Sequence, residues 1–460
     1  MEMIDSLDIF DYELFAEFPE FFSRINNDAP TDVSELARAI QFNMNFTCEN
    51  AKFDNVCISI MNDIKNNVTI NKHSENSLRS IIANLIYATK IHQRQAVYYS
   101  RRGSSYVKSP ATNIFNLRRN ETTAAIDALV EHDYLENTPG FHFANPGSRA
   151  AARQPRIQAK SKLIDALATA KDCKVYPSTN GDFVLLRDEK KKLKTHGRSQ
   201  SFLGMNNRVK MVNNIINSAS ISLPNDFIHK YSRGNARLVI DGNYIDLNRS
   251  HLYRIFNNNF KSGGRFYRGY WQQLNEDQRS LIQIDGQETI EKDFCAIHPN
   301  LLYMFETGRL FDGDPYDIPE HTGDKVLRKA TKLAFLILLN AKDKKSAQSA
   351  LSKRFHEHDN GKDESQSIFK KTNIKNLLDA IGRIHAPINK YFASNISGKL
   401  QFTDSRIAEE TMISLAQSGI VSLPVHDSFI VQKQYGNDLA SAMVEAFKKV
   451  TGSKFSPTIE

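Results

Sequence analysis

Cysteine is scarce in this sequence. Only four cysteines occur among 460 residues, and they are scattered at positions 48, 57, 173 and 295. Because they form no Cys-x-x-Cys pair and have no histidines at metal-ligand spacing nearby, the sequence predicts neither a disulfide framework nor a structural zinc site. We expect the thiols to be free, as in a reducing cytoplasm.

Long hydrophobic runs are also missing. No apolar stretch approaches the roughly 18 residues of a membrane helix. The first 15 residues, MEMIDSLDIFDYELF, are acidic where a signal peptide is basic. We therefore expect a cytoplasmic protein that does not contact membranes.

The net charge is small, with 60 Lys and Arg against 52 Asp and Glu, but it is unevenly distributed. Residues 1–150 contain 14 basic and 19 acidic residues, whereas residues 151–260 contain 19 basic and 8 acidic residues. The middle region, which includes Lys191, Lys192 and Lys194, is the candidate contact for a polyanion such as nucleic acid. The alternative for these lysines is a solvated surface loop.

Wholesale disorder is excluded, because 40% of the residues are hydrophobic and 28 of them are Phe. The length favours two or three domains. We expect a helical region at 1–74, a DNA-binding domain at 75–150, a basic linker or thumb-like region at 151–260, and a catalytic domain at 261–460.

The expected DNA-binding domain has the sequence pattern of a winged helix-turn-helix. Residues 74–100 have apolar positions at helical spacing, and residues 120–136 form a second helical pattern with Asn120 or Thr122 as its N-cap. A short strand and a Thr-Pro-Gly turn follow. In a winged helix the second helix enters the major groove, which would put Arg118 and Arg119 near phosphates. The alternative is an ordinary helical subdomain.

Two acidic positions lie at the ends of strand-like segments in the last 200 residues. Residues 281–293 read as a hairpin that turns at Asp285-Gly286 and ends at Asp293. Residues 419–432 read as two apolar strands with His426 and Asp427 at the turn. Carboxylates from adjacent strand ends can hold two divalent cations about 4 Å apart, and oxygen ligands suit Mg²⁺ or Mn²⁺.

A cationic helix is predicted between these two segments, at residues 324–343. Arg328 and Lys332 are four residues apart, so both side chains lie on one face of the helix. Arg binds anions as a fork and Lys binds them as a point charge, so a triphosphate suits the pair. A solvated helix face is the alternative for either residue alone.

Residues 261–433 resemble the palm and fingers of family A DNA polymerases, which are related to bacterial DNA polymerase I and to phage-type single-subunit RNA polymerases. DFCAIHPNLL is similar to motif A, RKATKLAFLILLNA to motif B and VHDSFIV to motif C. The resemblance implies that Asp293 and Asp427 bind metal, and that Arg328 and Lys332 clamp the triphosphate. It also implies that Lys332 protonates the pyrophosphate, and that Arg265 and Gln401 contact the primer and template.

Several positions depart from the family pattern. His298 stands where the DNA enzymes have a glutamate that helps to reject ribonucleotides, and Asn340 replaces a tyrosine at the end of motif B. Both residues would therefore contact the substrate differently. Ser428 replaces the glutamate of motif C, and in this respect the sequence resembles the phage-type RNA polymerases. His426 is expected to be a structural residue or to contact the primer end, rather than to bind metal. Asp404 is expected to lie on a helix surface or to support the site. The loop GDPYDI, which contains Asp314, has no assigned chemistry.

The sequence thus predicts an α+β fold: a right-hand polymerase with an antiparallel palm sheet and helical fingers, after a mostly helical N-terminal region with a winged helix. The preferred hypothesis is a DNA-dependent DNA polymerase of a phage, plasmid or mobile element, with two Mg²⁺ ions (Mn²⁺ as an alternative). It would act on primer, template and nucleoside triphosphates as a monomer, with replication accessory proteins as further partners. One alternative is an RNA polymerase or primase of the same superfamily, and the other is a non-catalytic replication initiator that keeps a palm scaffold.

Overall fold

The chain forms two compact units. The C-terminal unit contains Val184–Ser222 and Leu252–Glu460, and the N-terminal unit contains residues 20–183 and 223–251, as far as they are described. The basic region 151–260 contributes to both units. The computed structural model describes residues 39–48, 50–91, 94–107, 113–140, 154–170, 173, 175–177, 181–194, 196–231, 237–240, 243–247, 249–318, 323–359 and 373–460.

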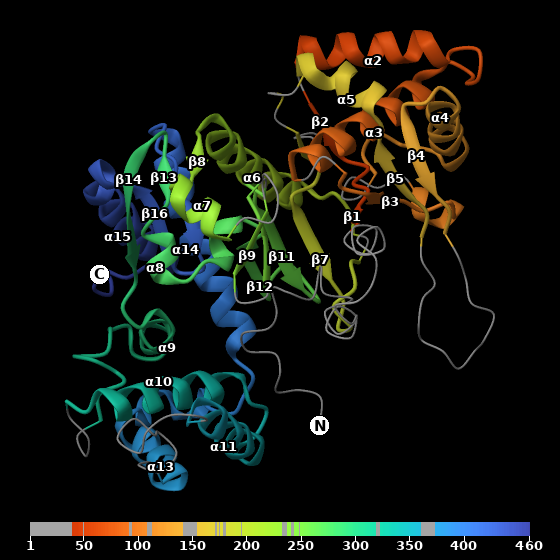
Figure 1. Cartoon of the computed structure of the whole chain (residues 1–460). Helices are drawn as coiled ribbons and strands as arrows, with labels where there is room; N and C mark the ends of the chain where they lie inside the picture. Colours follow the sequence, from red (N-terminus) through yellow and green to blue (C-terminus); the bar gives the residue numbers. More distant parts are fainter. Residues whose placement is uncertain are drawn as a thin grey trace. The chain divides into compact units, whose positions relative to one another are not determined.

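The N-terminal unit combines helices with a four-stranded sheet of order β1-β3-β5-β4 (Figure 1). Strand β2 pairs with β6, and β9 forms a hairpin with β10. The elements of this unit are β1 (Ile40–Gln41), β2 (Phe46–Thr47), α2 (Ala51–Ile64), α3 (Lys72–Ile91), β3 (Val97–Tyr98), η1 (Gly103–Tyr106), α4 (Arg119–Glu131), β4 (Leu135–Thr138), β5 (Arg156–Ala159), α5 (Ser161–Leu167), η2 (Ala168–Ala170), β6 (Tyr176–Pro177), α7 (Asn225–Tyr231), β9 (Arg237–Ile240) and β10 (Asn243–Asp246).

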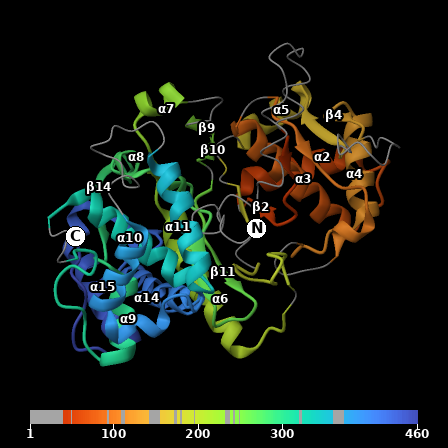
Figure 2. The same ribbon diagram turned by 90° about the horizontal axis from the view of Figure 1, so that it is seen from below.

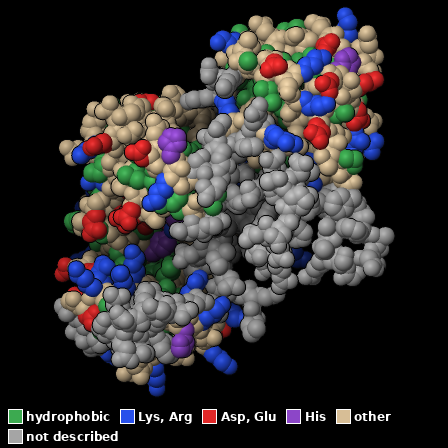
Figure 3. All heavy atoms as spheres, viewed as in Figure 1, with side chains coloured by type: hydrophobic (Ala, Val, Ile, Leu, Met, Phe, Trp, Pro, Cys, Tyr) green, Lys and Arg blue, Asp and Glu red, His purple; other side chains and the backbone are tan. Residues whose placement is uncertain are grey.

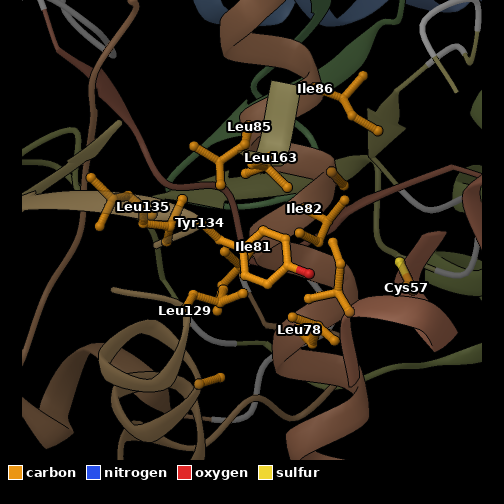
Figure 4. Packing of buried hydrophobic residues seen from close by; sticks show 14 of the residues in the cluster. Cys57, Leu78, Ile81, Ile82, Leu85, Ile86, Leu129, Tyr134, Leu135 and Leu163 are labelled. Atoms are coloured by element: carbon orange, nitrogen blue, oxygen red, sulfur yellow. The ribbon is translucent and has the colours of Figure 1, made fainter. Parts of the chain in front are cut away.

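Helix α3 is the centre of the N-terminal core. Its apolar residues are fully buried, as the periodicity of the sequence predicted, and Figure 4 shows them beside Leu129 of α4, Leu135 of β4 and Leu163 of α5. Burying such a set of side chains is the main stabilising contribution in a domain of this size. The α3 residues in this core include Leu78, Ile81, Ile82, Leu85 and Ile86.

The C-terminal unit contains two main sheets. One has five strands in the order β15-β16-β14-β13-β8, and all of its pairs are antiparallel. The other has the order β12-β11-β7, in which β11 runs parallel to β7 and antiparallel to β12. The strands are β7 (Val184–Arg187), β8 (Ile221–Ser222), β11 (Tyr253–Asn257), β12 (Gly263–Tyr267), β13 (Gln283–Ile284), β14 (Gln287–Asp293), β15 (Leu423–Val425) and β16 (Ser428–Gln432).

Helices pack on these sheets and on one another. Helix α15 packs on β14, β16 and α14, and α14 in turn contacts β12 and α6. Helices α10, α11 and α13 form a separate group, and α10 and α11 lie side by side in Figure 2. The helices of this unit are α6 (Gln200–Ser218), η3 (Tyr270–Gln273), α8 (Glu276–Arg279), α9 (Ile297–Thr307), α10 (Lys325–Asn340), α11 (Lys344–Asp359), α13 (Ile374–Ile384), η6 (Ala386–Tyr391), α14 (Ser397–Gln417), η7 (Lys433–Tyr435) and α15 (Gly436–Thr451).

The mixture of helices and antiparallel strands confirms the predicted α+β class. Among the described residues, none of the helices is long and apolar enough to span a bilayer. The four cysteines are free thiols, and Cys48, Cys57 and Cys173 are buried.

Two tight turns set the geometry of the five-stranded sheet. Ile284 pairs with Gln287, so Asp285 and Gly286 form a two-residue turn with φ of 51° and 74°. Positive φ at both positions is typical of the hairpin turns that match the twist of the strands. Val425 likewise pairs with Ser428, which leaves His426 (φ 61°) and Asp427 in the turn between β15 and β16. The structure therefore confirms both predicted hairpins.

Candidate active site

The carboxylates of Asp293 and Asp427 come from neighbouring strands of the five-stranded sheet. Asp293 ends β14 and pairs with Ser428, the first residue of β16, and Asp427 directly precedes Ser428. The backbone of Asp293 is also held on its other side, because its N–H and C=O bond the C=O and N–H of Glu460, both at 3.1 Å. We call Asp293 and Asp427 the carboxylate pair.

The carboxylate pair is electrostatically unfavourable without a cation. Crowding by protein atoms, which removes water from the carboxylate, and the charge of Asp427 raise the pKa of Asp293 to about 7. The positive charge of Lys332 acts in the opposite direction, which indicates that this lysine lies nearby. Asp293 still reaches solvent, as a residue that binds an incoming cation must.

The chemistry of the carboxylate pair suits an open metal site. Among the described residues, no group of three or more His, Cys, Asp or Glu side chains has the arrangement of a metal site. Mg²⁺ is commonly bound by one or two carboxylates, with water and substrate phosphates as the remaining ligands. Two adjacent carboxylates with mutual repulsion fit that kind of site, although they do not form a closed protein cage.

A second carboxylate on β14 is already neutralised. Glu291 accepts hydrogen bonds from Arg279 Nε at 2.7 Å and Arg279 Nη2 at 2.9 Å. Ser428 Oγ donates a third hydrogen bond to Glu291, at 2.5 Å. Glu291 therefore helps to fix the strand ends, and its oxygens are occupied by protein donors.

Helix α10 presents Arg328 and Lys332 on its exposed face. Asp324 caps the helix by accepting hydrogen bonds from Val326 N–H and Leu327 N–H. Ala330, Ala334 and Ile337 are buried on the opposite face, whereas Leu336 and Asn340 continue the accessible face by one turn each. We call Arg328, Lys332, Leu336 and Asn340 the cationic stripe.

Lys and Arg side chains gather in the region of α9 and α10, at the lower left of Figure 3. At the end of the cationic stripe, the amide of Asn340 donates to Leu336 O of its own helix at 2.8 Å. This bond orients the amide and uses one of its two N–H groups, so Oδ1 and the second N–H can still contact a substrate.

Two residues that sequence reasoning left without a role lie beside the cationic stripe. Asp314 accepts a hydrogen bond from Arg328 Nε, and this bond raises the pKa of Arg328. The ring of Tyr316 lies 5.7 Å from Arg328 Cζ and 6.0 Å from Lys332 Nζ. Burial and the charges of Asp427 and Asp314 raise the pKa of the Tyr316 phenol.

Arg265 and His298 meet on a buried carboxylate. Asp404 Oδ2 accepts hydrogen bonds from Arg265 Nη2 at 2.6 Å and His298 Nε2 at 2.8 Å, and Asp404 is only 4% exposed. Burial alone would raise the pKa of Asp404, but the charge of Arg265 and the bond with His298 outweigh it and lower that pKa. We call these three residues the Asp404 cluster. Asp404 is a supporting group rather than a surface residue of its helix.

Glycine at position 264 allows this arrangement. Gly264 has a φ of 87°, and a Cβ atom there would lie 2.6 Å from the ring of Phe256. Gly264 O accepts a hydrogen bond from the buried Arg254 Nε at 2.9 Å. The backbone of β12 can therefore approach β11 and α14 closely, which brings Arg265 next to Asp404.

His426 lies next to these groups. Burial and the positive charge of Arg265 lower its pKa to about 4, so its ring is neutral at physiological pH. Its ring lies 6.2 Å from that of Tyr267 in an edge-to-face arrangement. Gln401 lies three residues before Asp404 on α14 and is half-buried, so the two residues share one face of the helix.

The remaining candidates lie elsewhere. Lys191, Lys192 and Lys194 are exposed on a hairpin that extends from β7, in which Lys194 N–H bonds Leu186 O at 2.8 Å. Arg118 and Arg119 begin α4 in the N-terminal unit. Helix α4 starts earlier than predicted, because Thr122 uses its hydroxyl for a buried hydrogen bond with Ser77 (2.9 Å) instead of capping the helix.

No family model and no curated protein matches the chain. Among solved structures, the chain is similar to the POL domain of Pol1 from M. smegmatis in complex with DNA primer-template and dNTP. The TM-score is 0.32 and the sequence identity is 11%. The match covers 90% of this chain and 66% of that one, so the chain spans somewhat less than two thirds of that structure's length. A likeness of this degree assigns no activity.

Proposed function

We propose that the C-terminal unit is a template-directed nucleotidyltransferase that acts as a DNA polymerase. The observation that carries the proposal is the carboxylate pair at the ends of adjacent strands, with Lys332 of the cationic stripe close enough to lower the pKa of Asp293. A magnesium-bound nucleoside triphosphate matches such a site, because it carries both a divalent cation and a polyanion. Asp293, Lys332 and Asp427 are also the residues that motifs A, B and C of the sequence indicate.

Asp293 and Asp427 would hold two Mg²⁺ ions, with Mn²⁺ as a substitute. When bound, such ions activate the primer 3′ hydroxyl and neutralise the leaving pyrophosphate. The fixed strand ends position the two carboxylates before substrate arrives, so little reorganisation is needed at the moment of reaction. A cation also relieves the repulsion that raises the pKa of Asp293.

Arg328 and Lys332 would bind the triphosphate. Arg328 supplies a fork of donors, and Lys332 supplies a point charge that can also protonate the leaving pyrophosphate. Without substrate, Arg328 is paired with Asp314. A triphosphate carries more negative charge than one carboxylate, so it would replace Asp314 as the partner of Arg328.

DNA primer and template would occupy the side of the site formed by Arg265, His426 and Gln401. Arg265 keeps a side-chain exposure of 16% although it is paired with Asp404, so part of its guanidinium remains accessible. The exposed hairpin with Lys191, Lys192 and Lys194 would add contacts to phosphates.

A ribonucleotide-using enzyme, either an RNA polymerase or a primase, is the second candidate. The observation that favours it is His298, which bonds Asp404 and so presents a fixed imidazole where the resembled DNA enzymes have a glutamate. Ser428, which bonds Glu291, is the other residue shared with the RNA enzymes.

Extension of a labelled primer on a DNA template separates these candidates. The full chain is supplied with Mg²⁺ and either dNTPs or rNTPs, with and without primer. The proposal predicts primer-dependent extension with dNTPs. Exclusive use of rNTPs would favour the second candidate. Binding of DNA without any incorporation in Mg²⁺ or Mn²⁺ would favour the non-catalytic initiator.

A further inference from the structure

Six consecutive elements of the N-terminal unit have the topology of a winged helix. Along the chain they are α3, β3, η1, α4, β4 and β5. The three strands form an antiparallel sheet in which β5 lies between β3 and β4. In this topology α4 has the position of the recognition helix, the helix that enters the major groove in helix-turn-helix proteins.

One face of α4 is committed to the core of the unit. Ala125, Ile126 and Leu129 are completely buried, and α4 packs on α3. Thr122 joins the same face through its hydrogen bond with Ser77. Asn120 and Asp127 lie on the opposite face and are exposed, and Arg119 is exposed at the first position of the helix.

Charges around α4 are largely paired. Asp127 binds Arg101, and Glu121 lies 3.8 Å from Arg118. On the neighbouring strands and helices, Lys160 binds Asp133, and Lys162 binds Asp63. Among the described residues around α4, these four cations therefore already have carboxylate partners.

The first turn of α4 presents side chains of the types that read base edges in other proteins. Arg119 donates from Nε to Asn120 Oδ1 at 3.1 Å, so the two side chains form a joint surface. Among the described residues, no carboxylate is paired with Arg119. Arg pairs with guanine and Asn with adenine through two hydrogen bonds each, and Thr123 one turn later can also contact a base.

We propose that α4 binds the major groove of duplex DNA and recognises a specific sequence through Arg119 and Asn120. The proposal concerns the N-terminal unit and does not rest on the polymerase activity proposed for the C-terminal unit. Its consequence is that the affinity of the protein for duplex DNA depends strongly on the sequence of the duplex.

The test starts with the full chain and a library of random DNA duplexes. Rounds of binding and amplification at about 150 mM salt are expected to enrich one sequence motif. Affinity for that motif is then measured by fluorescence anisotropy and compared with affinity for a scrambled duplex of equal length. Failure to enrich a motif would overturn the proposal and would leave this face of α4 to a protein partner.

Variants connect the motif to α4. Arg119→Ala and Asn120→Ala are each expected to lower affinity for the motif about tenfold or more, and to leave affinity for the scrambled duplex unchanged. Lys52→Ala, which removes one exposed cation from α2 in the same unit, is the matched control and should change neither value. Equal affinity of Arg119→Ala and wild type for the motif would contradict the proposal.

Two further measurements keep this result separate from misfolding and from the polymerase hypothesis. Thermal unfolding followed by circular dichroism should be unchanged in both α4 variants, because their side chains are exposed. Extension of a primed template that lacks the motif should be unchanged as well. A failure of primer extension in every protein would count against the polymerase proposal alone.

Discussion

Asp404 forms a buried ion pair with Arg265, with 2.6 Å between Oδ2 and Nη2, across 139 residues of sequence. His298 binds the same oxygen. Asp404 therefore joins α14 to β12 through Arg265 and to α9 through His298. The positive charge of Arg265 also lies close enough to His426 to lower the pKa of that residue. A carboxylate with no obvious role in the sequence therefore organises one side of the candidate site.

Asp404→Asn should destabilise the protein. Removal of one member of a buried pair leaves the other charge without its partner, and we expect a loss of about 3 kcal/mol in the free energy of unfolding. The measurement is urea denaturation, with Glu288→Gln as the control, because Glu288 is exposed and pairs with the exposed Lys433. Equal loss in both variants would contradict the importance assigned to the Asp404 cluster.

The ion pair between Asp404 and Arg265 predicts that the free energy of unfolding depends on pH. The pKa of Asp404 is lower in the folded state than in the unfolded state, where it is about 3.9. The unfolded state therefore binds the proton first as pH falls, so the contribution of Asp404 is complete above about pH 4 and is lost below it. The difference in unfolding free energy between wild type and Asp404→Asn should be constant at neutral pH and shrink in acid.

Binding of divalent cations should depend on pH around 7. Because the pKa of Asp293 is about 7 without a cation, a proton must leave before a cation can bind at lower pH. We expect Mg²⁺ or Mn²⁺ affinity to rise up to about tenfold per pH unit below 7 and to level off above it. Isothermal titration between pH 5.5 and 8.5 measures this, and a pH-independent affinity over that range would contradict the assignment.

Loss of Asp314 should strengthen binding of the triphosphate. In Asp314→Asn, Arg328 no longer has a competing carboxylate, and exposed ion pairs contribute up to about 1 kcal/mol, so KM for the nucleotide should fall up to about fivefold. Arg328→Ala should raise KM, and Arg328→Lys should restore binding only in part, because lysine lacks the fork. An increase of KM in Asp314→Asn would show that Asp314 supports substrate rather than competing with it.

The lysine hairpin should contribute affinity for nucleic acid without contributing to chemistry. Simultaneous replacement of Lys190, Lys191, Lys192 and Lys194 by Gln should weaken DNA binding. It should also make the slope of log affinity against log salt shallower, by about 0.9 for each phosphate that the protein no longer neutralises. The maximal rate at saturating DNA should stay the same. Unchanged binding over a range of salt concentrations would count against this role.

The sequence predicted what local patterns determine. The turns at Asp285-Gly286 and His426-Asp427 follow from residue preferences over a few positions, and the burial of one face of α10 follows from its periodicity. These elements were enough to bring Asp293, Asp427, Arg328 and Lys332 into one candidate site.

Contacts between distant charged residues were not predictable in this way. The partners of Asp404, the pairing of Asp314 with Arg328, and the hydrogen bonds between Asp293 and Glu460 depend on how separate elements pack. A single carboxylate on a helix or in a loop has the same local pattern whether it is solvated or buried. Tyr316 was missed as well, because the local sequence does not show that its ring lies near Arg328 and Lys332.

The most direct test of the proposed function is single-nucleotide incorporation on a primed template by wild type, Asp293→Asn, Asp427→Asn and Glu288→Gln. If the carboxylate pair holds the catalytic cations, each Asp variant should lose about a thousandfold or more in rate, because several kcal/mol of charge stabilisation are removed. Glu288→Gln, a charge loss on the same strand, should incorporate nucleotide at the wild-type rate. Incorporation at wild-type rate by Asp293→Asn or Asp427→Asn would contradict the assignment.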